Sequence, residues 1–181
     1  MPGHEKSFLK KVTRDEWIDE CKYQIERLIN HNYKEIYDLI GAKQPEKYHP
    51  EGDAYNHTML VLDMSADLTK HMEENRKLEI RFSALVHDLG KGLTPKEEYP
   101  HHYGHESTGA ELVGTFGKNI KAPNNWIKCG KTACREHMRG GIFYKMKPSK
   151  KVEFKDSIKG KLSFPENDQD FVLLKSDGIP T

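Results

Sequence analysis

The feature that most constrains this chain is the pair His87-Asp88, which ends an apolar run at residues 84–86 and precedes Leu89-Gly90-Lys91. The run predicts a buried helix with an imidazole and a carboxylate at its inner end. Neither group is buried at low free energy without a partner, and a carboxylate in the last turn opposes the helix dipole. A bound cation would satisfy both groups, so the pair indicates a metal site. A capped helix end with a hydrogen-bonded histidine is the alternative that the pair alone leaves open.

Apolar residues at helical spacing dominate the chain and predict an all-α fold. A capping box at residues 13–16 predicts a first helix, and a shorter helix at 33–40 is expected to end at Gly41. Further helices are expected at residues 56–72, 78–88, 105–116 and 125–138, in a weaker pattern around 152–158, and after Phe164-Pro165. Residues 42–54 and 92–104 contain prolines and glycines and are expected to be loops.

The length of 181 residues suits one compact domain. We expect residues 1–47 to form an N-terminal helical segment that packs on a core of residues 48–181. Both parts are expected to belong to one structural domain.

The composition excludes several classes of protein. The formal net charge of +1 argues against a generic nucleic-acid binder with a strongly basic surface. Three cysteines without a CxxC pair predict neither a disulfide framework nor a structural zinc site. No apolar stretch is long enough to span a membrane, and the N-terminus lacks a signal-peptide core. We therefore expect a cytoplasmic protein without membrane contact and without strong nucleic-acid binding.

Two further residues offer the same ligand groups as the His87-Asp88 pair, an imidazole and a carboxylate, on predicted helices. His57 lies in the first turn of the helix expected at residues 56–72, on its apolar side, and Asp177 lies near the end of the last expected helix. Together these residues form a mixed nitrogen and oxygen ligand set from three predicted helices. Such a set suits Mn, Ni, Co, Fe or Zn better than Mg, and we expect the cofactor to be a divalent ion of one of these six metals.

The order His57, His87-Asp88, Asp177 matches the motif of the HD-domain phosphohydrolase superfamily. A longer string is more specific, and it reads HPEGD at 49–53, HTMLVL at 57–62, HDLGKGLTP at 87–95 and PHHYGH at 100–105. From about residue 48 to residue 177 the sequence resembles the HD domain of bacterial CCA-adding tRNA nucleotidyltransferases. The resemblance implies a compact helical bundle with a metal site between its helices.

The resemblance also implies an activity. CCA-adding enzymes carry a nucleotidyltransferase domain before the HD domain, and this sequence has neither the length nor the motif for one, so we do not expect CCA addition. The implied activity is that of a metal-dependent phosphohydrolase acting on 2′,3′-cyclic phosphodiesters, 2′-nucleotides and simple phosphomonoesters. The expected partner is a small nucleotide or the phosphorylated end of an RNA.

Asp88 and Lys91 are the expected catalytic residues. Asp88 could orient or deprotonate the attacking water in addition to binding the metal. Lys91 lies one helical turn beyond His87, from where it could reach a phosphate oxygen, as matching lysines in HD enzymes do. A solvated lysine after a helix end explains the same position equally well.

His105 and His137 are candidates for a second metal ion or for phosphate binding, because histidines at comparable places have these roles in HD enzymes. A hydrogen-bonded core histidine is the alternative for His137. Glu51 and His102 are expected to contact the substrate from loops near the pocket mouth. Asp53 could contact a ribose hydroxyl as well, although a turn-forming role suits it equally.

The leading hypothesis is therefore a 2′,3′-cyclic phosphodiesterase, 2′-nucleotidase and phosphatase. A 5′-nucleotidase or a hydrolase of signalling nucleotides would share the same metal site and is the first alternative. A nucleotide- or RNA-binding module without turnover is the second. The lysines at residues 145–151 are interpreted as a solvated helix face, because phosphate binding needs several contacts and the net charge is near zero.

Overall fold

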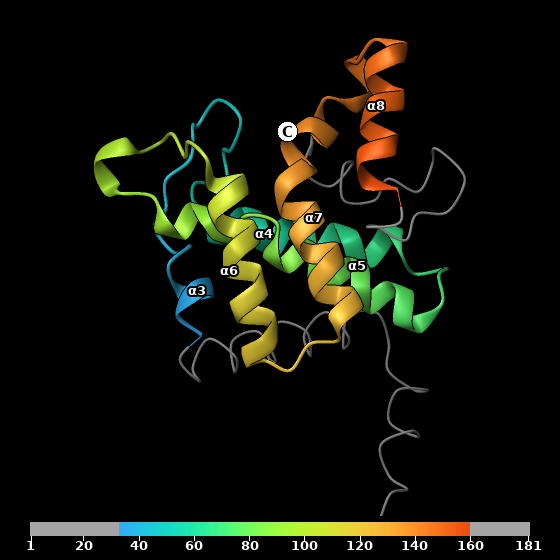
Figure 1. Cartoon of the computed structure of the whole chain (residues 1–181). Coiled ribbons are helices and arrows are strands. Elements are labelled where there is room, and N and C mark those ends of the chain that lie inside the picture. Colours follow the sequence, from blue (N-terminus) through green and yellow to red (C-terminus); the bar gives the residue numbers. More distant parts are fainter. Residues whose placement is uncertain (1–32, 160–181) are drawn as a thin grey trace, which may run out of the picture. The chain divides into compact units, whose positions relative to one another are not determined.

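The computed structural model describes residues 33–159, which fold into helices joined by loops (Figure 1). The helices are α3 (Lys34–Tyr37), α4 (Ala54–Leu68), α5 (Glu74–Val86), α6 (His105–Asn119), α7 (Asn124–Gly141) and α8 (Pro148–Ile158), with 3-10 turns η1 (Leu89–Leu93), η2 (Lys96–Glu98) and η3 (Phe143–Lys145). Residues 33–159 contain no β-strand, only an isolated bridge between Lys43 and Asp53. The all-α prediction is confirmed.

Among the described residues, those from Glu35 to residue 159 belong to one compact unit, and the expected boundary between residues 47 and 48 stays a prediction. Within residues 33–159, no helix has both the length and the hydropathy needed to cross a bilayer. Residues 1–32 and 160–181 lie outside the described part of the chain. The first and last predicted helices and the packing of the N-terminal segment therefore stay predictions.

Helix α4 begins at Ala54, two residues before the predicted start, because Asp53 caps it. Asp53 has extended backbone angles (φ −112°, ψ 169°), and its Oδ1 accepts a hydrogen bond from Asn56 N over 2.8 Å. Its Oδ2 accepts a second bond from Gly41 N over 2.9 Å, which ties the preceding loop to the helix start. The cap therefore places His57 in the first turn of α4.

The core forms around α5, which packs against α4 and α7, while α6 packs against α7 and η1 (Figure 1). Phe82, Leu85 and Val86 of α5 and Val113 and Phe116 of α6 are buried in this core. Removal of their apolar surface from water is the main stabilising contribution. Because α5 is central, its C-terminal end is enclosed by neighbouring elements.

Two glycines let η1 and α6 touch through their backbones. A Cβ on Gly90 would collide with the carbonyl oxygen of His105, and a Cβ on Gly109 would lie 2.8 Å from the backbone nitrogen of Gly90. Only glycine fits where two backbones approach this closely. This contact holds His105, the first residue of α6, beside the turn that contains Asp88.

Several helices extend beyond their expected ranges, and α7 and α8 do so at glycine and proline residues. Helix α7 continues through Gly140 and Gly141, which were expected to end it. Helix α8 begins at Pro148, well before the pattern around residue 152, because proline is favoured in the first helical turn, where its missing N–H has no intrahelical partner to lose.

Candidate metal centre

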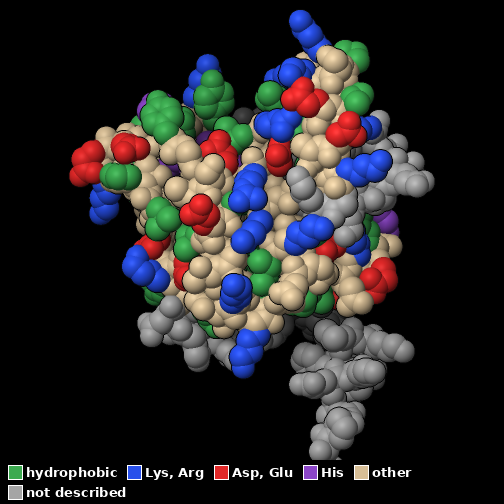
Figure 2. Space-filling view, viewed as in Figure 1, with side chains coloured by type: hydrophobic (Ala, Val, Ile, Leu, Met, Phe, Trp, Pro, Cys, Tyr) green, Lys and Arg blue, Asp and Glu red, His purple; other side chains and the backbone are tan. Residues whose placement is uncertain are grey.

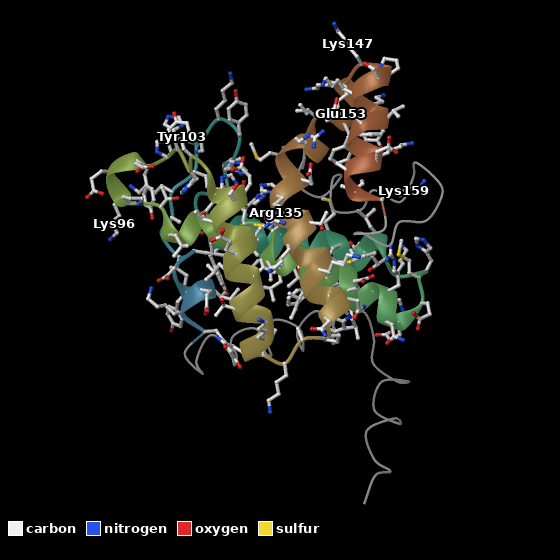
Figure 3. The ribbon with its side chains drawn as sticks, in the orientation of Figure 1. Lys96, Tyr103, Arg135, Lys147, Glu153 and Lys159 are labelled. Atoms are coloured by element: carbon white, nitrogen blue, oxygen red, sulfur yellow. The ribbon has the colours of Figure 1, made fainter. Side chains whose placement is uncertain are left out.

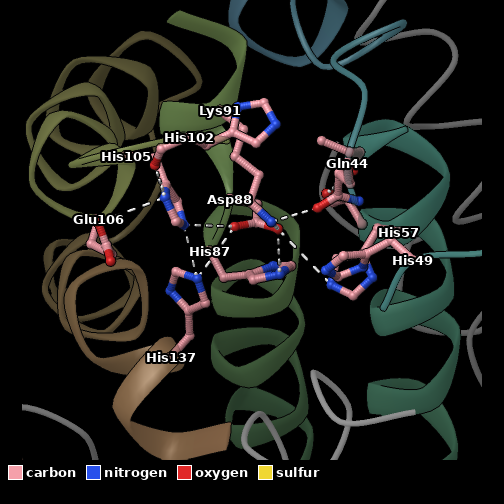
Figure 4. A network of polar contacts seen from close by, with 12 residues as sticks. Gln44, His49, His57, His87, Asp88, Lys91, His102, His105, Glu106 and His137 are labelled. Atoms are coloured by element: carbon pink, nitrogen blue, oxygen red, sulfur yellow. Dashed lines mark hydrogen bonds and ion pairs between the residues drawn. The ribbon is translucent and has the colours of Figure 1, made fainter. Parts of the chain in front are cut away.

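Asp88 lies at the centre of a buried polar cluster, in the turn between α5 and η1 (Figure 4). Its side chain is 0% exposed. One carboxylate oxygen, Oδ2, lies 2.7 Å from Lys91 Nζ, 3.2 Å from His87 Nε2 and 3.9 Å from His57 Nε2. These groups come from the end of α5, from η1 and from α4, so this side of the carboxylate joins three elements.

The other carboxylate oxygen faces two further histidines. Oδ1 of Asp88 lies 3.4 Å from His105 Nε2 and 3.3 Å from His137 Nε2, and the two Nε2 atoms are 3.2 Å apart. His105 begins α6 and His137 lies in α7. All three side chains are buried.

The remaining ring nitrogens decide which nitrogen of each imidazole carries the proton. Nδ1 of His87, His105 and His137 each donates to the backbone carbonyl three residues earlier, over 2.7, 2.6 and 2.8 Å. Nδ1 of His57 donates to Glu51 Oε1 over 2.7 Å. Because a neutral imidazole carries one proton, Nε2 of each ring presents its lone pair toward Asp88.

Lone pairs that converge on a carboxylate repel one another unless a cation lies between them. Asp88 belongs to two groups whose ligand atoms lie within 4.8 Å of one another, with His57 and His87 in one and with His105 and His137 in the other. Imidazole nitrogens with carboxylate oxygens are a common ligand set for divalent transition metals. Ligating histidines normally donate their other ring N–H to an acceptor, as these do. The residues present therefore fit a divalent metal ion.

The charge of Asp88 is set by competing effects. Burial alone would raise the pKa of its carboxyl, but the positive charge of Lys91 Nζ, 2.7 Å from Oδ2, is the largest opposing effect, and the pKa lies well below its usual range. Asp88 is therefore ionised at neutral pH, as a metal ligand must be.

Glu51 contacts the histidines of this region. Its Oε1 accepts hydrogen bonds from His57 Nδ1 over 2.7 Å and from His49 Nδ1 over 3.0 Å. Burial would raise the pKa of Glu51, but hydrogen bonds from its own backbone and from these histidines lower it overall. Burial lowers the pKa of His49. In this structure Glu51 orients His57, and its predicted contact with a substrate stays a prediction.

The structure brings most predicted site residues together. His57, His87, Asp88, Lys91, His105 and His137 meet in the Asp88 cluster, whereas Asp177 lies outside the described residues. His102 lies nearby, but its ring nitrogens already contact Thr94 Oγ1 at 3.0 Å and the Lys43 carbonyl at 2.9 Å. Its predicted substrate contact stays a prediction.

Sequence reasoning missed Gln44, whose Oε1 accepts a hydrogen bond from Lys91 Nζ over 2.6 Å. Gln44 lies in a loop without helical periodicity, so no local signal singled it out. A cavity of about 650 Å³ opens beside the cluster, and its wall includes Gln44, His49, Lys91 and His105. The Asp88 cluster, whose groups could hold a metal ion, and the cavity are therefore adjacent, which is the arrangement that a hydrolytic site needs.

Comparisons with known proteins agree with this geometry. The HD domain family model matches residues 54–155, which include the described members of the Asp88 cluster. The chain is 41% identical over 116 residues to the Multifunctional CCA protein of Mannheimia succiniciproducens, covering 64% of this chain and 27% of that protein. It is 46% identical over 103 residues to the Multifunctional CCA protein of Herminiimonas arsenicoxydans, covering 57% of this chain and 23% of that protein.

The chain thus spans about a quarter of the length of the curated relatives that it matches. No solved structure matches it. The family model covers more than half of the 181 residues, and the histidines and aspartate of the motif lie around one buried carboxylate. The chain belongs to the HD domain family and is a metal-dependent phosphohydrolase of that superfamily.

Proposed function

We propose that this chain hydrolyses nucleotide phosphoesters, as a 2′,3′-cyclic phosphodiesterase, 2′-nucleotidase and phosphatase. The observation that carries the proposal is the convergence of four imidazole Nε2 atoms on the two oxygens of Asp88. A bound divalent cation lowers the pKa of a water molecule and offsets negative charge that develops on phosphorus. The relatives named Multifunctional CCA protein motivate the choice of nucleotide substrates.

We assign the metal ligands as His57, His87, Asp88 and Asp177, and we assign His105 and His137 to a second ion or to the phosphate. The low pKa of Asp88 makes its carboxylate a weak base. Asp88 is therefore better suited to hold and orient the attacking water than to remove its proton.

Lys91 is the proposed phosphate-binding cation. An ammonium has three N–H donors, and Lys91 Nζ uses two of them on Asp88 Oδ2 at 2.7 Å and Gln44 Oε1 at 2.6 Å. The side chain is buried at the wall of the cavity. Its remaining donor is available to a phosphoryl oxygen, where the positive charge favours an anionic substrate.

The test is an assay of purified protein with Mn²⁺, Ni²⁺, Co²⁺, Zn²⁺ and Mg²⁺ against 2′,3′-cyclic AMP, 2′-AMP and 4-nitrophenyl phosphate. We expect metal-dependent release of 2′-phosphate products or inorganic phosphate, abolished by EDTA. Turnover of 5′-nucleotides alone would replace this proposal with a 5′-nucleotidase. Tight nucleotide binding without turnover in any metal would identify a binding module instead.

A further inference from the structure

Gln44 leaves a hydrogen-bond donor unused at the cavity wall. Its side chain is 5% exposed, and its Nε2 has no hydrogen-bond partner among residues 33–159. The orientation of the amide is not ambiguous, because Lys91 can only donate and must therefore face the amide oxygen. A buried amide donor without a partner is unfavourable, because it has lost its hydrogen bonds to water without replacement. A ligand oxygen in the cavity would satisfy it.

Gln44 and Lys91 together form what we call the floor of the cavity. Both side chains are buried, they contact each other, and Lys91 also contacts Asp88 of the metal cluster. One neutral donor and one cationic donor side by side suit an oxyanion with several acceptor oxygens. The floor is therefore equipped for a phosphoryl group next to the metal-ligating residues.

The mouth of the cavity has the opposite character. It is lined by large apolar or aromatic side chains that are unusually exposed, namely Tyr48 (68%), Tyr103 (80%), Met138 (52%) and Ile142 (54%). Hydrophobic side chains gather over the loop before α6 in the space-filling view (Figure 2), and Tyr103 stands on that loop (Figure 3). The rings of His101 and Tyr103 stack at 5.6 Å with an interplanar angle of 24°.

This combination favours a ligand with two different ends. Singly exposed apolar side chains are ordinary, but a group of them around one cavity marks a binding surface. Inorganic phosphate would fill only a small part of about 650 Å³ and would leave the mouth in water. Aromatic rings bind nucleobases by stacking, whichever base is present.

We propose that this cavity binds a nucleoside phosphate, with the phosphoryl group on Gln44 and Lys91 at the floor and the base against Tyr48 and Tyr103 at the mouth. The inference rests on the proposed function and adds that the base itself contributes to recognition. Gln44 is then a substrate-binding residue as well as the acceptor that positions Lys91.

The mouth is tested with 2′-AMP and its base-free counterpart, ribose 2-phosphate. We expect wild-type protein to show a KM about tenfold lower for 2′-AMP, with similar kcat, because stacking contributes to binding of the base. Tyr103→Ala should raise the KM for 2′-AMP by a similar factor and leave ribose 2-phosphate unchanged. Tyr37→Ala, at an exposed tyrosine of α3 away from the cavity lining, is the matched control and should change neither value.

The floor is tested with Gln44→Met, which has a similar length, adds no charge beside the phosphate and removes the amide donor. We expect this variant to bind inorganic phosphate about tenfold more weakly and to raise the KM of both substrates by the same factor. A merely structural role would leave phosphate binding unchanged while lowering the melting temperature. Phosphate binding equal to that of wild type would overturn the assignment of Gln44.

The test separates this inference from the proposed function. Equal KM values for 2′-AMP and ribose 2-phosphate in an active wild-type protein would overturn the base site while the hydrolase stands. If wild type hydrolyses neither compound, the 2′-nucleotidase part of the proposed function fails, and calorimetric titration with the same two compounds still decides whether the base is bound. Equal affinities there would also reject the base site.

Discussion

Two regions of the described chain, the Asp88 cluster and helix α8, are both rich in charged and ring side chains. In the cluster, the side chains of Asp88 and Lys91 are 0% and 7% exposed, and Asp88 Oδ2 lies 2.7 Å from Lys91 Nζ. On α8, the pair Lys150 and Glu153 has a similar separation of 2.6 Å, but both side chains are more than half exposed. The distances are alike, so the difference between the regions lies in their access to water.

That difference separates what stabilises each region. An exposed ion pair contributes about 0–1 kcal/mol, because water competes with it. Helix α8 is instead held by a small apolar cluster of Phe143, Phe154 and Ile158, with Met146 packed against it. Burying charged groups is unfavourable by several kcal/mol per ion unless they are well paired. Burial of the Asp88 cluster is thus unfavourable for folding, and metal binding explains why these groups are buried. Helix α8, in contrast, is stabilised by apolar contacts.

The largest effect is expected from Asp88→Asn. The amide cannot serve as an anionic ligand, so we predict loss of bound metal and a fall in kcat of about a thousandfold, equivalent to several kcal/mol of transition-state stabilisation. Metal analysis and steady-state kinetics measure both. The control is Asp156→Asn on the exposed surface of α8, which should match wild type. Full activity in Asp88→Asn would remove Asp88 from the site.

Asp177→Ala tests the one predicted ligand outside the described residues. If Asp177 completes the ligand set, its removal should weaken metal binding by at least about a hundredfold, since even loss of residues that only support ligands has effects of that order. Competition with a metal-binding dye reports the affinity. An unchanged affinity would show that the described histidines and Asp88 suffice.

Phe154→Ala should separate the two regions energetically. Phe154 is 1% exposed, and its truncation should lower the free energy of unfolding by about 3 kcal/mol without changing kcat per folded molecule. Lys150→Ala on the same helix is the matched control and should change stability by less than about 0.5 kcal/mol. Denaturant unfolding of both variants gives the comparison. A larger loss in Lys150→Ala than in Phe154→Ala would refute the apolar explanation of α8.

The smallest effect on stability at neutral pH is expected from ionisation of the Cys134 thiol, which lies on α7 beside the cluster. Burial, followed by the negative charge of Asp88, raises the pKa of its thiol to about 12. Because the pKa is raised in the folded state, the protonated thiol contributes fully to the free energy of unfolding at pH values below the pKa of the unfolded thiol. This contribution is lost as the pH rises toward 12. At pH 8 the native thiol should therefore resist iodoacetamide, and peptide mapping should find it modified only after unfolding. Rapid modification of folded protein would contradict the buried, neutral thiol.

Sequence patterns predicted the helices of the core and the residue types of the site, but with errors at the boundaries. Helix α7 passes through Gly140 and Gly141 because helix packing overrides the weak helix propensity of glycine. Gln44 could not be identified from the sequence, because its role depends on Lys91, 47 positions further along the chain. His105 and His137 were assigned from resemblance, and only their distances to Asp88 show how the two share one carboxylate oxygen.

By itself, the sequence determined the features that depend only on contacts within about one helical turn. The hydrogen bonds from Nδ1 of His87, His105 and His137 each reach only three residues back, so the tautomer of each ring is a local property. The tertiary structure alone decided that these rings converge, because their separations depend on how α4, α5, α6 and α7 pack. The backbone contact between Gly90 and Gly109 brings α6 close enough for the convergence to occur.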